Sequence, residues 1–404
     1  NDFTRYSLAA SRIIFEGGNP YPWNPERQAT YKYFPLNAVL LGPLTLCPVP
    51  VAQGVWTALN VGLLIWCFGL HRAAAGPGRL PCWVWAVSLA ISATYINRNL
   101  KLGQWNTSVY CLAFAGVWLA FRRPWLGGAA LGLSAALKFM PGLFVFYLGA
   151  RRQWKACLAT LLALAFFLLV FPGLILGPSR HLQLLRDYRT RARTSLDDMT
   201  RDNAVVGFSF SATLYAYLTP AKQWMGKEGD ESKSIQINAL NLKPRAARRV
   251  VLTVAVALLV GLTVFSARRA GLPSADRGEA WLLETGLWFL LLLAITPEAR
   301  KAHFLTLFTP AFGLALAAAR APRDLGLRQV AKYALGASAV LVALNSKIFG
   351  WTKYNELVEA CGSYSLIIII LASASCMVLG GHLNPDPPTR LACPGGASVS
   401  RDSD

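Results

Sequence analysis

Asp2 is the first residue of this chain whose type and position could support chemistry. It opens a polar, aromatic segment that runs to Leu36 and precedes a series of long apolar runs. A carboxylate beside a membrane segment is costly unless it has a task or a partner. Asp2 is therefore a candidate general base that would take the proton of an acceptor hydroxyl. An ordinary solvated aspartate in a loop is the competing interpretation.

Two further titratable side chains lie at or inside apolar runs. Lys138 interrupts the run LGLSAALKFMPGLF. A lone lysine there either pairs with an anion, such as a phosphate, or extends its ammonium group to the membrane surface. His303 follows TPEARKA at the start of another apolar run and could donate to a phosphate or to a leaving group. A structural role is the more common one for a single histidine at a helix start.

A short polar segment, NRNLKLGQWN, connects two apolar runs at residues 97–106. Its amides and its indole are the groups that hydrogen bond to sugars and stack on them. Asn99, Gln104, Trp105 and Asn106 are therefore candidate sugar-binding residues. A tight polar turn with an interfacial tryptophan is the competing interpretation.

The composition places these residues in a membrane protein. Of the 404 residues, 54% are hydrophobic and only 15% are charged, whereas soluble proteins carry about 25% charged residues. The net charge of +20 does not indicate nucleic acid as a partner, because the Lys and Arg residues lie in short loops between apolar runs. The chain has no P-loop, GxSxG or HExxH motif, and its four histidines are scattered, so we expect no metal or other cofactor.

The apolar runs predict an all-α polytopic membrane protein with about ten spans. The predicted spans are Val55–Leu70, Cys82–Ile96, Thr107–Phe121, Trp125–Ala150, Cys157–Leu176, Val250–Phe265, Ala280–Ile295, Phe304–Ala319, Ala331–Leu344 and Ser363–Leu379. The run from Trp125 is broken at Lys138 and Pro141, which predicts a hairpin of two short helices. Three prolines in Phe34–Val49 predict a re-entrant or interfacial element rather than a full crossing.

Loop charge predicts the orientation of these spans. Arginines such as Arg72, Arg123 and Arg151 mark the cytoplasmic side by the positive-inside rule. The extracytoplasmic side then receives residues 1–33, 97–104, 177–249, 296–302 and 350–361, and with them the candidate site. Residues 180–203 predict an amphipathic surface segment. We expect one integral-membrane domain over residues 1–381, preceded by an upstream membrane helix, and a disordered cytoplasmic tail over residues 382–404.

Six segments of the chain resemble, in order and spacing, those of one known family. They are DFTRYSLAASRIIFEGGNPYP, YKYFPLNAVLLGPLTLCP, NLKLGQWN, LGLSAALKFMPGLFVFYL followed by RRQWKA, GFSFSATLYAYL and TPEARKAHFLTLFTPA. On these segments the chain resembles glycosyltransferase family 87, polytopic mannosyltransferase-like enzymes of the GT-C class. The resemblance implies a GT-C-type fold in which an outer-face loop carries a catalytic aspartate.

The resemblance also implies roles for individual residues. An enzyme of this kind transfers a hexose, mannose in the best-known cases, from a polyprenyl-phosphate donor to a lipid or glycan acceptor with inversion. Asp2 would be the base, and Lys138, His303 and Arg98 would bind the donor phosphate. The sugar and acceptor pocket would be lined by Tyr6, Asn19, Tyr21, Asn99, Gln104, Trp105 and Asn106. Arg300, Lys301 and Ala302 occupy positions where members often carry an aromatic residue and a second histidine.

Two other functions compete with this hypothesis. A lipid or sugar transporter or flippase would show internal symmetry and paired half-helices at the membrane midplane, and the break at Lys138 leaves room for it. The polar segments collected on one face argue against it. A non-catalytic scaffold would be favoured by loss of the acidic and basic candidates, but Asp2 and Lys138 are both present.

Overall fold

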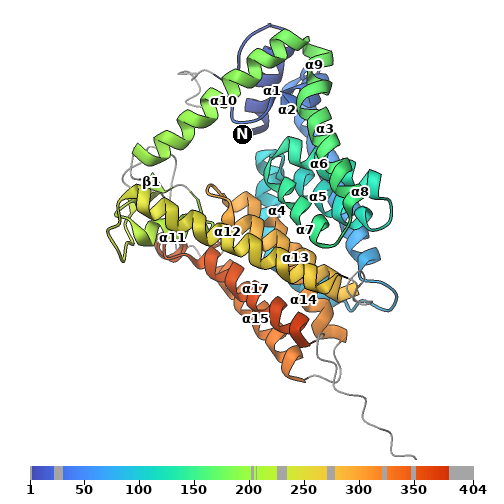
Figure 1. The fold of residues 1–404 in the computed structure, drawn as a ribbon, viewed down its shortest axis with the longest axis vertical. Helices are drawn as coiled ribbons and strands as arrows, with labels where there is room; N and C mark the ends of the chain where they lie inside the picture. Colours follow the sequence, from blue (N-terminus) through green and yellow to red (C-terminus); the bar gives the residue numbers. More distant parts are fainter. Residues whose placement is uncertain are drawn as a thin grey trace, which may run out of the picture.

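The described residues fold into helices with one small sheet (Figure 1). The computed structural model describes residues 2–21, 31–201, 204–205, 207–224, 234–270, 278–320, 325–346 and 352–381. The N-terminal elements are α1 (Asp2–Ile14), α2 (Pro35–Leu41), η1 (Gly42–Leu46), α3 (Val49–Ala74), α4 (Cys82–Leu102), α5 (Asn106–Ala120), α6 (Pro124–Leu137), η2 (Met140–Leu143), α7 (Phe144–Ala150), α8 (Trp154–Ala165), the π-helical η3 (Phe166–Val170) and α9 (Phe171–Leu176).

The second half contains the sheet and the C-terminal bundle. Its elements are α10 (Pro178–Arg201), β1 (Ala204–Val205), α11 (Phe210–Leu218), β2 (Lys222–Trp224), β3 (Ser234–Ile235), α12 (Pro244–Arg269), α13 (Gly278–Ile295), η5 (Lys301–Leu307), α14 (Phe308–Arg320), α15 (Leu325–Leu344), α16 (Thr352–Ala360) and α17 (Ser363–Gly381). Strand β2 pairs in parallel with β1, Ala204 opposite Lys222, and antiparallel with β3, Gln223 opposite Ile235.

Seven helical segments among the described residues are long and apolar enough to cross a membrane. They are Val49–Ala74, Trp154–Leu176, Pro244–Arg269, Gly278–Ile295, Lys301–Arg320, Leu325–Leu344 and Ser363–Gly380. The prediction of about ten spans is not confirmed. Helices α5, α6 and α7 are too short to cross alone, and α4 is long enough but not apolar enough. A multi-pass membrane protein is the coarser conclusion that stands.

The first segment differs from the predicted loop, because Asp2 begins helix α1. Phe3, Tyr6, Ala10 and Ile13 recur at helical spacing and are buried on one face. The Pro and Gly residues that suggested a loop come only after Ile14. Asp2 in the first turn also favours the helix, since the N-terminal end of the helix dipole stabilises an anion.

The predicted break at Lys138 is present. Helix α6 ends at Leu137, Lys138 adopts an extended backbone, and η2 begins at Met140. A Cβ on Gly127 would lie 2.3 Å from the Ala120 nitrogen, and one on Gly128 would lie 2.5 Å from the Ala156 carbonyl oxygen. These glycines therefore let α6 pack closely between α5 and α8, which fixes the position of Lys138.

The loops gather at two opposite ends of the long helices. At one end Arg320 binds the Ala75 and Pro77 carbonyls and the Glu279 carboxylate. At the other end the Phe208 amide donates to the Ala299 carbonyl, and Lys301 pairs with Glu359. The segments predicted to share a side of the membrane thus lie together, while which end faces the cytoplasm stays a prediction. The predicted tail, residues 382–404, lies outside the described residues.

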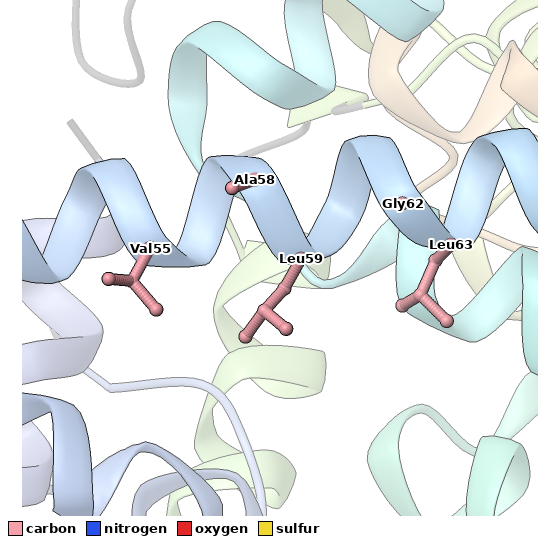
Figure 2. A pocket seen from close by; sticks show the side chains of 5 residues that line it. All are labelled: Val55, Ala58, Leu59, Gly62 and Leu63. Carbon is pink, nitrogen blue, oxygen red and sulfur yellow. The ribbon is translucent and has the colours of Figure 1, made fainter.

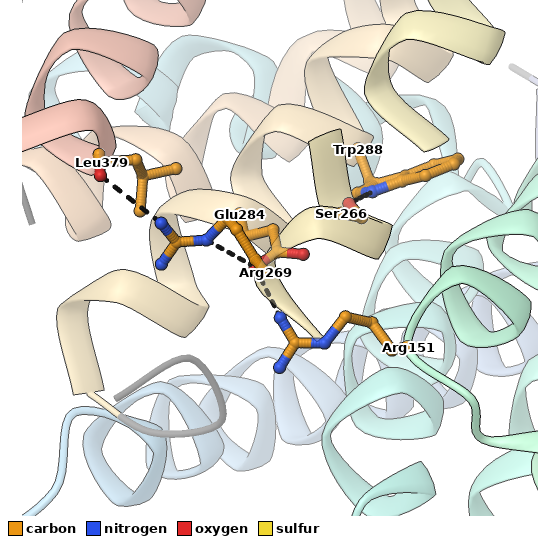
Figure 3. A network of polar contacts seen from close by, with 6 residues as sticks. All are labelled: Arg151, Ser266, Arg269, Glu284, Trp288 and Leu379. Carbon is orange, nitrogen blue, oxygen red and sulfur yellow. Dashed lines mark hydrogen bonds and ion pairs between the residues drawn. The ribbon is translucent and has the colours of Figure 1, made fainter. Parts of the chain in front are cut away.

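A buried ionic cluster ties four helices together near the Arg320 end (Figure 3). Glu284 of α13 accepts from Arg151 at 2.9 Å and from Arg269 at 3.2 Å, and all three side chains are almost fully buried. Arg269 also donates to the Leu379 carbonyl at the end of α17. Arg151 therefore does not lie on a loop surface, as its predicted cytoplasmic position suggested, but inside the protein.

The outward face of α3 is apolar and shallowly grooved. Figure 2 shows the groove, about 520 Å³, lined by Val55, Ala58, Leu59, Gly62 and Leu63. Trp56 and Asn60 of the same helix are buried on its other face. Helix α3 thus presents an apolar surface outward and polar groups inward, as a lipid-facing helix beside a polar site requires.

Candidate active site

The turn between α4 and α5 brings the amide-rich segment against α1. Helix α4 ends in a left-handed Gly103 with φ of 67°, a conformation that favours glycine. A Cβ at Gly103 would lie 2.6 Å from the Cβ of Phe3, so glycine also permits the close approach of α1. The Gly103 carbonyl accepts from the Trp56 indole of α3 at 3.0 Å. Gln104 and Asn106 are thereby placed beside Asp2.

A continuous chain of side-chain contacts joins Asp2, Gln104, Asn106, Lys138 and His303. The Gln104 amide nitrogen donates to Asp2 Oδ2 at 2.5 Å, and the Asn106 amide nitrogen donates to Gln104 Oε1 at 2.7 Å. Lys138 Nζ donates to Asn106 Oδ1 at 2.5 Å and lies 2.6 Å from His303 Nε2. Five residues spread over 302 positions of the sequence therefore form one site.

The orientation of both amides follows from the chemistry of the chain's two ends. An ammonium group only donates, so the oxygen of Asn106 must face Lys138. The Asn106 nitrogen then faces the Gln104 oxygen, and the Gln104 nitrogen faces Asp2. An ionised carboxylate only accepts, which satisfies the last bond. Each amide accepts at one end and donates at the other.

Asn99 is fully engaged with the protein. Its amide nitrogen donates to the Tyr95 and Ala302 carbonyls at 2.8 and 2.6 Å, and its oxygen accepts from Asn106 at 3.0 Å. The residue is 1% exposed. These contacts favour a role in holding Asn106 and the segment before His303, rather than contact with a sugar.

The charge state of Lys138 and the tautomer of His303 depend on each other. Burial lowers the pKa of Lys138 from its usual 10.5 to about 8, whereas the Glu298 and Asp2 carboxylates raise it. When Lys138 is charged, His303 Nε2 must accept and Nδ1–H can donate to the Arg300 carbonyl at 3.0 Å. When Lys138 is neutral, Nε2–H can donate to it while Nδ1 accepts from the Arg300 amide at 2.9 Å. The surroundings accommodate both tautomers.

Several contacts hold the segment that carries His303. The Phe208 amide donates to the Ala299 carbonyl at 2.8 Å, and Lys301 lies 2.5 Å from Glu359. Gly207, with φ of 156°, passes so close that a Cβ there would lie 2.7 Å from the Pro297 carbonyl oxygen. The loop before α11 and helix α16 therefore brace the approach to His303.

The predicted tyrosines lie next to this chain of contacts. The Tyr6 and Tyr33 hydroxyls share one hydrogen bond of 2.9 Å. Burial raises the pKa of Tyr6 well above its usual value and that of Tyr33 to about 12. The Asp2 charge contributes to raising the pKa of both side chains. Both hydroxyls therefore stay protonated near neutral pH. Tyr21 donates to the Tyr33 carbonyl at 3.0 Å and belongs to the same aromatic group.

The other predicted residues lie further along or turn away. Asn19 donates to Asp187 of α10 at 2.8 Å, so it holds the segment after α1 against that helix. Trp105 is 3% exposed and packs edge-on against Trp56, with ring centroids 4.6 Å apart. Arg98 is exposed on α4, and its charge acts on Tyr364 of α17 rather than on Lys138 or His303.

Three contributors were not found from the sequence. Arg5 lies 3.9 Å from Asp2 Oδ1 one helical turn later, a spacing that becomes meaningful only once α1 is known to be a helix. Glu298 acts on Lys138 through its charge, and Glu359 pairs with Lys301. For Glu298 the sequence did contain a signal, because the segment TPEARKA places it five residues before His303.

Comparison with known proteins identifies the family of the chain. The sequence profile of glycosyltransferase family 87 matches residues 31–297, which is most of the chain. The chain belongs to glycosyltransferase family 87. Asp2 lies 29 residues before the matched region and His303 six residues after it, whereas Gln104, Asn106 and Lys138 lie within it.

The names of three relatives refer to a lipid-linked sugar or to a furanose sugar. A polyprenol-phosphate-mannose-dependent alpha-(1-2)-phosphatidylinositol mannoside mannosyltransferase of Mycobacterium tuberculosis is 31% identical over 168 residues, 38% of this chain and 39% of the relative. The enzyme of the same name from Mycolicibacterium smegmatis is 31% identical over 144 residues, 32% of each chain. An alpha-(1->3)-arabinofuranosyltransferase of Corynebacterium glutamicum is 27% identical over 177 residues, 41% of each chain.

These matches are partial. The matched part of this chain spans 32% to 41% of the length of these relatives. No solved structure matches the chain significantly.

Proposed function

We propose that this protein transfers a hexose, most simply mannose, from a polyprenyl-phosphate donor to a hydroxyl of a lipid or glycan acceptor. The observation that supports this best is the continuous contact chain from a carboxylate, Asp2, to a half-buried cation, Lys138, within one site. Two relatives named for polyprenol-phosphate-mannose supply the donor class. The acceptor class follows from the same names, which refer to phosphatidylinositol mannosides.

The chemistry is a single inverting displacement. The acceptor oxygen attacks the anomeric carbon, the bond from that carbon to the phosphate oxygen breaks, and its electron pair leaves with the phosphate. Asp2 takes the acceptor's proton, and the first turn of α1 holds its carboxylate toward Gln104. Two groups on opposite sides of the sugar are what such a displacement needs.

The leaving phosphate needs positive charge rather than a proton, because a phosphate monoester leaves as a stable anion. Lys138 supplies that charge from a half-buried position where water screens it less than at the surface. His303, in contact with Lys138, holds the ammonium group and can donate to a phosphate oxygen through Nε2 when Lys138 is engaged elsewhere. Arg98 is exposed on α4 and stays a more distant candidate for the same phosphate.

The sugar and acceptor are expected on the side of Asp2 that bears Tyr6, Tyr21 and Gln104. The protonated hydroxyl of Tyr6 and the second N–H of Gln104 are polar groups next to the base. The polar loops at this end of the helices fit an extracytoplasmic site in the cell membrane of a bacterium, the side predicted by loop charge.

The deciding experiment is transfer of radiolabelled mannose in membranes, from polyprenyl-phosphate mannose, with the wild type and Asp2→Asn side by side. We expect label in lipid or glycan with the wild type and a loss of about 100-fold or more with Asp2→Asn. Expression level and melting temperature of the two proteins should match. Normal transfer by Asp2→Asn would remove Asp2 as the base.

The same assay with polyprenyl-phosphate arabinose separates the two sugars, because one relative is an arabinofuranosyltransferase. Transfer of arabinose alone would keep the mechanism and replace mannose. No transfer of either sugar, with uptake of a labelled lipid or sugar across vesicles, would favour the transporter hypothesis instead.

A further inference from the structure

We propose that Gln104 and Asn106 form a polarised relay that couples the charge of Lys138 to the carboxylate of Asp2, so that the phosphate site and the base do not act independently. The proposal rests on the proposed function for its consequence, but the relay itself stands on the contacts alone. Gln104 and Asn106 then position the two ends, and the second N–H of Gln104 is still available to a sugar or acceptor.

All bonds of the relay point the same way. Lys138 donates to Asn106, Asn106 to Gln104 and Gln104 to Asp2, at 2.5, 2.7 and 2.5 Å. Amides bonded in series polarise one another, because each donated hydrogen strengthens the next acceptor and donor. A cation at one end and an anion at the other reinforce that direction. No other arrangement of the two amides satisfies both ends.

The relay is held in place by groups that do not belong to it. Asn99 accepts the second hydrogen of the Asn106 amide at 3.0 Å and is itself fixed by two backbone carbonyls. Asn106 is 5% exposed, so bulk water does not compete with its three bonds. A side chain whose every polar group is engaged in this way transmits a change at one neighbour to the other.

Other charged and titratable groups face the two ends. Lys138 is in contact with His303 and feels Glu298, and Asp2 faces Arg5, Tyr6 and Tyr33. None of these bridges Lys138 to Asp2 within the described part of the chain. The coupling between the two is therefore attributable to the amides or to the direct field between the charges, and these can be separated.

The coupling has a consequence for the order of events. A phosphate that engages Lys138 draws the ammonium group away from Asn106, and the bond from Gln104 to Asp2 weakens in turn. The carboxylate then holds a proton more readily. The base would become effective when the sugar donor is in place, which limits loss of the activated sugar to water.

The relay is tested by titrating Lys138 itself in the intact, detergent-solubilised protein. The pH dependence of modification by a small amine-reactive reagent, read by mass spectrometry of the Lys138 peptide, gives the titration midpoint of this half-buried amine. The proteins compared are wild type, Asp2→Asn, Gln104→Met and the double variant. Gln183→Met, at an exposed position on α10, is the matched control.

We expect Asp2→Asn and Gln104→Met each to lower the midpoint by about half a pH unit or more. The double variant should show no further shift, because Gln104→Met already disconnects Asp2 from Lys138. The Gln183→Met midpoint should equal that of the wild type. A double variant whose shift is the sum of the single shifts overturns the relay, since the two charges would then interact only through space.

Transfer assays distinguish failure of the relay from failure of the function. In transfer assays the acid limb of the Gln104→Met rate profile should stop responding to the donor. The non-additive titration without any sugar transfer would leave the relay standing and refute the proposed function. Transfer with additive titration shifts would do the reverse.

Discussion

Lys138 is the residue whose chemistry depends most directly on pH. Burial brings its pKa down to about 8, so the charged form dominates below that value and is lost as the pH rises through it. The charge that we assign to phosphate binding is therefore fully present at neutral pH and disappears on the alkaline side. A bound phosphate opposes that loss, because an adjacent anion favours the charged amine.

Affinity for the sugar donor should accordingly fall above about pH 8 in the wild type. Lys138→Arg should abolish this alkaline limb, because arginine does not lose its proton in this range. Lys138→Ala should weaken donor binding more than acceptor binding at every pH. Binding of labelled polyprenyl-phosphate mannose between pH 6 and pH 10, about the range that brackets the Lys138 pKa, measures both. An unchanged alkaline limb in Lys138→Arg would assign it to another group.

Residue types were predictable from the sequence, and residue partners were not. Asp2, Lys138 and His303 stood out because charge at a membrane segment is costly, and the family resemblance gave each a role. The sequence contains no signal that the amide nitrogen and oxygen of Asn99 both hydrogen bond to protein groups, or that Trp105 packs against Trp56. Such partners lie up to 203 positions apart, as for Asn99 and Ala302, beyond any periodic pattern.

The segment before η5 is the element on which His303 depends. Its shape is set by neighbours from elsewhere in the chain: Gly207 against Pro297, Phe208 against Ala299 and Glu359 against Lys301. The extended backbone of Arg300 then turns His303 toward Lys138. A substitution that disturbs any of these contacts should affect the proposed phosphate site at Lys138 and His303 more than the proposed base, Asp2.

Gly207→Ala should therefore reduce donor binding with little loss of folding. Its Cβ would lie 2.7 Å from the Pro297 carbonyl oxygen, so the segment must shift. We expect a fall in donor affinity of about tenfold, equivalent to about 1.4 kcal/mol. Gly261→Ala on α12, which meets no atom within 4 Å, is the matched control. Equal donor affinity in both variants would show that the brace does not position His303.

Most helices could be predicted, and the early helix α1 could not. Runs of apolar residues marked α3, α12, α13, α14, α15 and α17 to within six residues of each end. Helix α1 was predicted as a loop because the whole segment from Asn1 to Leu36 is polar, aromatic and rich in Pro and Gly. Its helical face becomes apparent only when Phe3, Tyr6, Ala10 and Ile13 are seen to share one buried side.

At the scale of the whole molecule, one ionic cluster holds the bundle at the end remote from the site. Glu284 balances Arg151 and Arg269, and the three residues come from α13, the end of α7 and the end of α12 (Figure 3). A buried pair of this kind adds little over apolar packing, yet removal of one partner leaves the others as uncompensated charges.

Glu284→Gln should lower the free energy of unfolding by about 3–5 kcal/mol, because two buried arginines lose their counter-ion. Glu279→Gln is the control, since its partly exposed pair with Arg320 at 3.3 Å should contribute about 0–1 kcal/mol. Thermal unfolding in one detergent compares the two. A melting temperature for Glu284→Gln as high as that of Glu279→Gln would mean that the cluster is not a structural tie.

The two ends of the molecule should lie on opposite sides of the membrane. Arg72 and Asn97 are both exposed. Arg72 lies in the last turn of α3 and Asn97 lies near the end of α4, so they mark opposite ends of the helices. Cysteine placed at Asn97 should react with an impermeant maleimide in intact cells, and cysteine at Arg72 should react only after lysis. Cys393 and the cysteines exposed in the described part of the chain, Cys47, Cys82, Cys361 and Cys376, are first replaced by serine. The reverse labelling pattern would invert the orientation.

The distance along the chain between Lys138 and His303 also governs when the enzyme can come into being. The two contacting residues are separated by 165 positions, and a ribosome adds about 5–20 residues per second. Lys138 thus waits about 8 to 33 s for its histidine. Throughout that interval a growing chain carries Asp2 and Lys138 but lacks His303. The contact chain is therefore complete only after His303 has been synthesised, and under the proposed function a chain released before that residue would be inactive.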